Sequence, residues 1–241
     1  MKKHIRKYYE QLYQGQKGDK VRQLGGKPLA VELGYPPGVI DSLPDEIWED
    51  FLSCGNVLPH LHPNPGDMVL NLGCGAGVDS IVLRISAGAR LTVVNLDAAL
   101  PVLRKARRLA GRFFPRIEFE FVCAEGDSLP FGPSCFDSII LNGVFNLFEH
   151  KGPLIVELYR ILKPGGVVAG ADLCRRQILP DYFASEPDAW AWCMSGALSQ
   201  DELRAAFESC GFATLDLLPE NMDEYFDRMI FSFRKKGRVN R

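Results

Sequence analysis

A short apolar run that ends in three closely spaced glycines constrains the fold more than any other feature of the chain. The run is Val69–Leu72, and the glycines are Gly73, Gly75 and Gly77. Glycine suits such a turn because the backbone takes unusual φ values there and no Cβ blocks an approaching ligand. A dinucleotide fingerprint would need glycine in place of Val78, and no Gly-Lys-Ser/Thr follows for a P-loop. The pattern predicts a strand, a tight turn and a helix, with either a ligand-binding or a purely structural turn.

Strand-like and helix-like stretches alternate after this turn. Such alternation predicts a Rossmann-like α/β domain with a mainly parallel seven-stranded sheet and helices on both faces. The expected strands are Met68–Leu72, Leu91–Leu96, Ile117–Cys123, Phe136–Leu141, Val167–Leu173, Phe212–Leu218 and Met229–Arg234. Helices are expected from the glycine turn to about Ala87 and over Ala98–Arg112, Leu154–Leu162 and Gln200–Cys210.

The first 65 residues differ from the rest of the chain. Breaks rich in glycine and proline at 25–28 and 34–38 separate short helical stretches around 3–14 and 44–53. We predict an N-terminal helical and loop appendage over 1–65, and a Rossmann-like domain over 66–241 that includes C-terminal elements of a substrate site. The paired Tyr8 and Tyr9 and the flexible breaks suggest that the appendage acts as a lid.

Two acidic residues follow the second and third expected strands. Asp97 closes the second strand, where an acid in this topology lies beside the glycine turn and accepts hydrogen bonds from ribose hydroxyls. Asp97 also precedes a helix, so it can serve as an N-cap. Glu125 follows the third strand and can accept from an adenine amino group, while Gly126 lets the backbone approach the ring. A solvated loop acid is the alternative for Glu125.

The composition limits the partners and the compartment. The formal net charge is −2, which gives nucleic acid or an anionic membrane no electrostatic attraction. No apolar run reaches the ~18 residues of a membrane span. The seven cysteines are odd in number and scattered, which favours reduced thiols in a cytoplasmic protein over a disulfide framework. We expect no metal site, and the sequence leaves the oligomeric state open.

Together these motifs resemble class I S-adenosylmethionine-dependent methyltransferases over roughly residues 65–175. The resemblance rests on Leu70–Gly77, Asp97, Leu129-Pro130-Phe131 with Phe136-Asp137, and Leu162–Gly166, in that order. It implies an enzyme that uses S-adenosylmethionine as its cofactor. The implied cofactor-binding residues are Asn71, Gly73, Cys74, Gly75, Gly77, Asp97, Glu125, Gly126 and Asn142. Asn71 departs from the family pattern, in which an acid is usual.

A narrower resemblance is to arsenite methyltransferases. It rests on Leu33–Tyr35, Cys54–Asn56, Gly73–Asp79, Val144–Leu147 and Cys193–Ala197. In that family three cysteines bind trivalent arsenic beside the cofactor methyl group. Cys54 and Cys193 match two of them and are the implied catalytic residues, whereas Gly143 stands at the position of the third.

The missing thiol changes the acceptor that the resemblance implies. Arsenic(III) is soft and prefers sulfur ligands. Three thiolates satisfy arsenite, but two thiolates satisfy a monomethylated arsenical. We therefore expect a methyltransferase for a small molecule, arsenite-methyltransferase-like with a reduced thiol site.

Two alternatives stay open. One is a methyltransferase for another small metabolite with a sulfur, selenium, oxygen or nitrogen acceptor, for which His150, Glu149 and Asp172 are candidate bases. The other is a protein that binds S-adenosylmethionine without turnover. The remaining cysteines outside the glycine turn are expected to be small core residues: Cys123, Cys135, Cys174 and Cys210.

Overall fold

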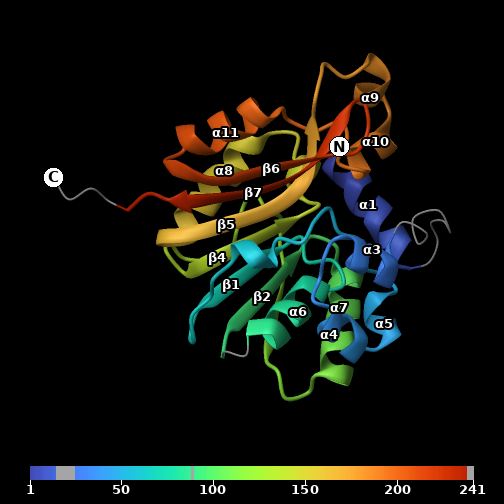
Figure 1. Cartoon of the computed structure of the whole chain (residues 1–241), viewed down its shortest axis with the longest axis vertical. Helices are drawn as coiled ribbons and strands as arrows, with labels where there is room; N and C mark the ends of the chain where they lie inside the picture. The colour runs from blue at the N-terminus through green and yellow to red at the C-terminus, as the bar shows by residue number, and fades with distance from the viewer. Residues whose placement is uncertain (15–24, 88–89, 238–241) are drawn as a thin grey trace.

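A seven-stranded sheet forms the centre of the computed structural model, which describes residues 1–14, 25–87 and 90–237. The strand order is β3-β2-β1-β4-β5-β7-β6 (Figure 1). The strands are β1 Met68–Leu72, β2 Thr92–Asp97, β3 Phe119–Cys123, β4 Phe136–Asn142, β5 Leu162–Arg175, β6 Phe212–Asn221 and β7 Phe226–Lys235. Strands β1 to β5 run parallel to one another, and β7 pairs antiparallel with both β5 and β6. The predicted fold class is confirmed.

The helices include two short 3-10 turns. They are α1 Lys2–Tyr13, α3 Gly26–Glu32, α4 Pro37–Ser42, α5 Asp45–Trp48, η1 Leu58–His60, α6 Val78–Ala87, α7 Leu100–Phe113, η2 Phe145–Leu147, α8 Lys151–Ile161, α9 Asp181–Ser185, α10 Pro187–Ala191 and α11 Gln200–Ser209. None of these described helices has the length and apolar character that crossing a membrane requires.

Alternating strand residues bury the two faces of the sheet under different helices. On one face Leu158 of α8 and Phe207 of α11 pack with Leu141 in one hydrophobic cluster. On the other face Leu83 of α6 packs with Val69. Figure 1 shows α8 and α11 together along one side of the sheet, with α6 and α7 on the other. The period of two along the strands therefore produces the expected three-layer arrangement.

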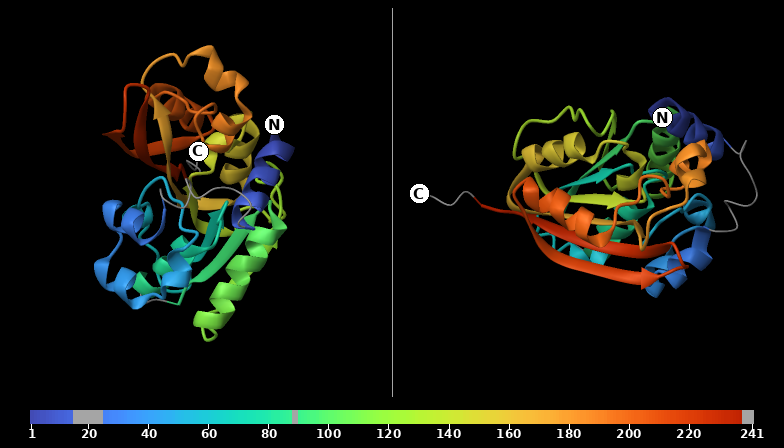
Figure 2. Two further views of the ribbon diagram at one scale, coloured as in Figure 1. Left: turned by 90° about the vertical axis from the view of Figure 1, so that its right-hand side faces the viewer. Right: turned by 90° about the horizontal axis from the view of Figure 1, so that it is seen from above.

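The N-terminal helices gather at the carboxyl ends of the parallel strands. Helix α1 lies beside α7 and α10 (Figures 1 and 2). Helices α3, α4 and α5 share a hydrophobic cluster with α6, in which Tyr35, Ile47 and Trp48 are almost completely buried. The division into 1–65 and 66–241 stays a prediction, and residues 15–24 lie outside the described part of the chain.

The N-terminal region holds more helix than expected. The sequences read as breaks begin helices instead, since α3 starts at Gly26 and α4 starts at Pro37. Proline is tolerated there because the first N–H of a helix has no intrahelical partner. Conversely, the helix expected around 44–53 covers only Asp45–Trp48.

The end of α8 also differs from the prediction. Strand β5 begins at Leu162, directly after α8, and not at Val167. The register against β4 shifts after Leu162, because Phe136 pairs with Leu162 while Ser138 pairs with Val167. The segment 163–166 directly follows the end of α8, as expected for the end of a helix, and it forms a bulge within the strand. Cys123, expected in the core, is exposed at the end of β3.

Candidate functional site

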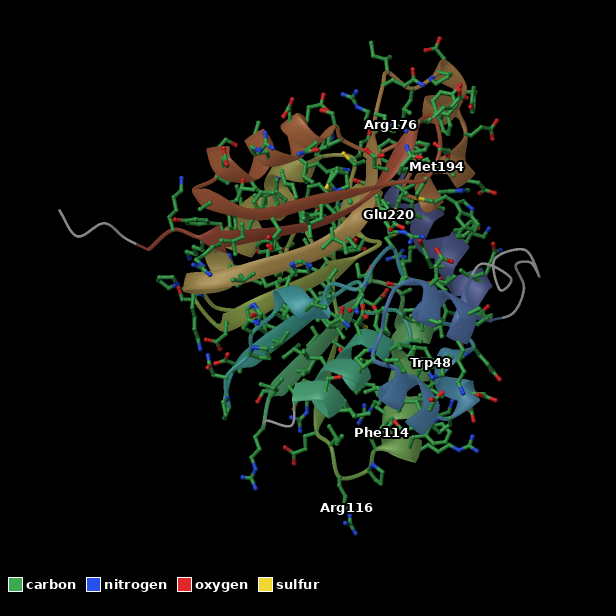
Figure 3. All side chains as sticks on the ribbon, in the orientation of Figure 1. Trp48, Phe114, Arg116, Arg176, Met194 and Glu220 are labelled. Atoms are coloured by element: carbon green, nitrogen blue, oxygen red, sulfur yellow. The ribbon has the colours of Figure 1, made fainter. Side chains whose placement is uncertain are left out.

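A cavity of about 600 Å³ opens at the carboxyl ends of β1, β2 and β4. Its wall contains nine of the eleven predicted site residues, brought from segments far apart in the sequence: Cys54, Gly73, Cys74, Gly75, Asp97, Glu125, Gly126, Asn142 and Cys193. Helix α1 contributes further wall residues. Met194, which follows Cys193 and also lines the cavity, is labelled in Figure 3 and shows where the thiol end lies.

The glycine turn forms as predicted, with φ of 70° at Gly73, 53° at Gly75 and 79° at Gly77. A Cβ at Gly73 would lie 2.5 Å from the Val144 side chain, and one at Gly75 would lie 2.5 Å from the Tyr13 hydroxyl. Both the left-handed backbone and the close contacts therefore require glycine. Without side chains at these positions, a ligand can approach the backbone.

Asp97 connects the glycine turn to α7. One carboxylate oxygen accepts from the Ala99 N–H at 2.9 Å, and the other accepts from the Gly75 N–H at 3.2 Å. Burial raises the pKa of Asp97, and these backbone hydrogen bonds act in the opposite direction. Asp97 therefore ties the glycine turn to the residues just before α7, and it also lines the cavity.

The loop after β3 forms the next part of the wall. Glu125 pairs with Arg6 of α1 at 3.5 Å, so this acid has a partner and is not simply solvated. A Cβ at Gly126 would lie 2.6 Å from the Phe148 ring. Gly126 is therefore needed for the loop to pack against Phe148.

Asn71 and Gly77 are not part of the cavity wall. The Asn71 side chain is buried and donates to the Ser80 hydroxyl at 2.9 Å, and Ser80 donates to Asn95 at 2.6 Å. This chain of hydrogen bonds joins β1, α6 and β2 behind the glycine turn. Sequence reasoning placed Asn71 at the cofactor, whereas its side chain points into the fold.

Asp79 is a wall residue that sequence reasoning did not select. It accepts from the Tyr35 hydroxyl at 2.5 Å and from the Asn142 amide at 3.0 Å. Burial raises the pKa of Asp79, and the two hydrogen bonds oppose that shift. Asp79 thus places a carboxylate in the cavity wall, where Asn71 places no side chain. The sequence feature that could have identified Asp79 is its position in the first turn of the helix that follows the glycines.

The thiols of Cys54 and Cys193 lie next to each other at one end of the cavity. The Cys54 N–H donates to the Asn142 side chain at 3.0 Å. The Cys193 thiol donates to the Gly143 carbonyl at 3.4 Å. A Cβ at Gly143 would lie 3.3 Å from the Cys54 sulfur. The fold thus brings together the three positions that the family resemblance implies, two of them with thiols.

The backbone and surroundings of Cys193 are unusual. Its φ is +63°, a conformation that non-glycine residues rarely adopt. Contact with the Cys54 thiol, followed by burial, raises the pKa of Cys193 well above its usual value. In the ligand-free protein this sulfur is therefore a protonated thiol at neutral pH.

A buried acid and a partly buried amine lie beside the thiols. Asp172 accepts from the Asn146 and Leu173 N–H groups at 3.0 and 2.9 Å, and burial raises its pKa to about 6. Burial lowers the pKa of Lys151 to about 8. Asp172 lies within β5 and not at a strand end, and sequence reasoning ranked it only as one base among three. Among the described residues, no three His, Cys, Asp or Glu side chains form a group that could hold a metal ion.

Comparisons with known proteins place the chain in a family. The model of the family described as "Methyltransferase domain" matches residues 63–211. The chain belongs to this methyltransferase family. A demethylmenaquinone methyltransferase of Clavibacter sepedonicus is 31% identical over 222 residues, which cover 78% of this chain and 88% of the relative. The predicted resemblance to methyltransferases is confirmed.

Arsenite methyltransferases are among the relatives of this methyltransferase. That of Halobacterium salinarum is 31% identical over 195 residues, which cover 80% of this chain and 49% of the relative. The chain spans about half the length of such curated relatives. The solved structure of an arsenic(III) S-adenosylmethionine methyltransferase from Chlamydomonas reinhardtii superposes with a TM-score of 0.70 at 26% identity, covering 85% of this chain and 75% of that one.

Proposed function

We propose that this chain transfers a methyl group from S-adenosylmethionine to a trivalent arsenical that already carries one methyl group. One observation carries the proposal: two thiols lie in contact at one end of the cofactor-sized cavity, and the third thiol position is Gly143. The similarity to arsenite methyltransferases supports the choice of arsenic as the acceptor.

The residues of the cavity fit the cofactor. The glycine turn leaves its backbone open, Asp97 presents a carboxylate to ribose hydroxyls, and Asp79 presents one to the methionine ammonium group. The proposal assigns Glu125 and Gly126, which also line the cavity, to the adenine ring. When bound, S-adenosylmethionine supplies a methyl group that the sulfonium has already activated.

The two thiols fit the valence of a monomethylated arsenical. Such an arsenical has two exchangeable hydroxyl groups, and each thiol replaces one of them. The thiol proton leaves with the hydroxyl as water, so the protonated state of Cys193 does not prevent binding. Arsenic then has two sulfur ligands and one carbon ligand and keeps its lone pair. Arsenite would keep one exchangeable position, because Gly143 offers no third sulfur.

A nucleophile with a free lone pair needs no general base. The contribution of the chain is therefore alignment of acceptor and cofactor and exclusion of water, which together can lower a barrier by up to ~7–11 kcal/mol. Helix α1 covers the cavity, and Tyr9 closes its thiol end by donating to the Ala191 carbonyl at 2.9 Å.

Serine replacements test the thiol site. Cys54→Ser and Cys193→Ser should each lower kcat/KM for monomethylarsenic(III) by at least about a hundredfold, since a soft centre loses one of two sulfur ligands. Cys210→Ser is the matched control, because Cys210 lies after α11 and outside the cavity wall. Full activity of both site variants on this acceptor would refute the thiol site and leave the cofactor site unaffected.

A second candidate is methyl transfer to an oxygen or nitrogen acceptor that must lose a proton. Asp172 favours it, because a carboxylate with a pKa of about 6 beside the acceptor end is suited to act as a base. Activity that depends on Asp172 and survives both cysteine replacements would select this candidate.

A further inference from the structure

Helix α1 presents two tyrosines that reach opposite ends of the cavity. Tyr9 and Tyr13 are four residues apart, so they lie on the same face of the helix, one turn and about 6 Å apart along its axis. Both rings line the cavity. The same short segment thus contacts the place for the acceptor and the place for the cofactor.

Tyr9 lies at the acceptor end. It is partly buried, and it interacts electrostatically with the thiols of Cys193 and Cys54. Its hydroxyl donates to the carbonyl of Ala191, two residues before Cys193, at 2.9 Å. Because Cys193 has a φ of +63°, its turn is held in a conformation that needs outside support. Tyr9 provides that support from a part of the chain far away in sequence.

Tyr13 lies at the cofactor end. Its hydroxyl occupies the space above Gly75, where a Cβ would approach it to 2.5 Å, and it faces the backbone of Ala76. Asp97 and Cys74 are its neighbours in the cavity wall. Tyr13 therefore contacts the turn whose backbone is open to the cofactor.

Polar contacts link the helix to both sides of the cavity. Arg6 pairs with Glu125 at 3.5 Å, and Lys2 pairs with Asp127, both in the loop after β3. On the other side His4 lies 3.3 Å from Asp188 of α10. Helix α1, which carries both tyrosines, thus contacts both the loop after β3 and α10, the helix that precedes Cys193.

We propose that Tyr9 and Tyr13 are positioning residues, which hold the acceptor-binding thiols and the cofactor-binding turn at a fixed separation. Methyl transfer requires the reacting atoms to lie roughly 3–3.5 Å apart and in line, so an error in this separation lowers the rate even when both ligands bind. This inference rests on the proposed function, because it assigns the thiols to the acceptor.

Removal of single hydroxyl groups tests the two halves separately. Tyr13→Phe should raise the Kd for S-adenosylmethionine in calorimetry about three- to tenfold, the loss expected for one hydrogen bond, and leave capture of phenylarsine oxide by the two thiols unchanged. Tyr9→Phe should weaken that capture, measured as displacement by ethanedithiol, about three- to tenfold and leave the cofactor Kd unchanged. Each variant should also lower kcat. Tyr159→Phe, in a tyrosine that packs against Phe212 outside the cavity wall, is the matched control.

Two results would overturn the inference. Either variant could stay within about twofold of the wild type in its own binding measurement, or either could change both measurements together, which indicates general loosening of α1. Neither measurement requires turnover. The two hypotheses can therefore fail separately. A wild-type protein that binds both ligands but transfers no methyl group would contradict the proposed function, and the two binding measurements would still test the positioning role.

Discussion

Restoring a third thiol should change which arsenical the protein methylates. The variant Gly143→Cys places a side chain at the one corner of the acceptor site that lacks sulfur. Its Cβ would lie 3.3 Å from the Cys54 sulfur, and the Cys193 sulfur already contacts the Gly143 carbonyl. Three thiols would then face one point, which suits arsenite with its three exchangeable positions.

The substitution has a cost that can be worked from the backbone. Gly143 has a φ of +66°, and an L-residue in that region is destabilised by about 1–2 kcal/mol. For a chain of this size that corresponds to a fall in Tm of roughly 2–8 °C. Gly143→Ser has the same backbone cost and nearly the same volume, so it separates the effect of sulfur from the effect of filling the space.

The assay is transfer of labelled methyl to arsenite in excess thiol, for the wild type and both variants. Gly143→Cys should raise the arsenite rate at least about tenfold, since tenfold needs only about 1.4 kcal/mol and a third thiolate adds a soft ligand. Gly143→Ser should not raise it. Equal rates for the two variants, or no gain in a folded Gly143→Cys protein with the expected Tm, would refute this reasoning.

Three further variants test separate parts of the site. Asp97→Ala removes the acceptor for the Gly75 N–H and for ribose, so calorimetry should show a rise of more than about tenfold in the S-adenosylmethionine Kd; an unchanged Kd would contradict the ribose role. Gly126→Val should abolish cofactor binding in the same measurement, because even a Cβ there would lie 2.6 Å from Phe148; normal binding would show that the loop adapts. Burial raises the pKa of Asp172 from 3.8 to about 6, so the folded state keeps this proton bound to a higher pH than the unfolded state does. The wild type should therefore lose up to about 3 kcal/mol of stability as pH rises from roughly 4 to 6. Urea unfolding should show a smaller loss for Asp172→Asn over this range, and identical slopes would refute the assignment.

Local patterns made much of the fold predictable. The glycine turn and Asp97 could be identified because each depends on neighbours in sequence: a strand before the turn, a helix after it, and the end of the next strand. The strand pattern likewise predicted the sheet, apart from the start of β5, where the strand was expected only from Val167 and a bulge after Leu162 was not expected.

Other features depend on contacts that no local pattern encodes. The place of Asp79 in the first turn of α6 could be seen in the sequence, but its contacts with Tyr35 and Asn142 depend on the fold. Asn71 was assigned to the cofactor by its place in the motif, but its partner Ser80 lies on the side away from the cavity. The perturbed Asp172 also required the structure, because burial by the surrounding elements sets its pKa.

The contact between the thiols was expected from the family resemblance and not from spacing. Cys54 lies before β1 and Cys193 lies after α10, and nothing between them in the sequence specifies their distance. The fold brings both thiols to Gly143, so the absence of a third thiol at that position bears on which acceptor the site can bind.

The most direct test of the account compares two acceptors with the wild-type protein. Labelled methyl transfer from S-adenosylmethionine is measured with arsenite and, separately, with monomethylarsenic(III), both in excess thiol. The account predicts turnover of the monomethyl species and little turnover of arsenite. No turnover of either acceptor, with cofactor binding shown by calorimetry, would contradict the arsenic site and direct the search to acceptors that use Asp172.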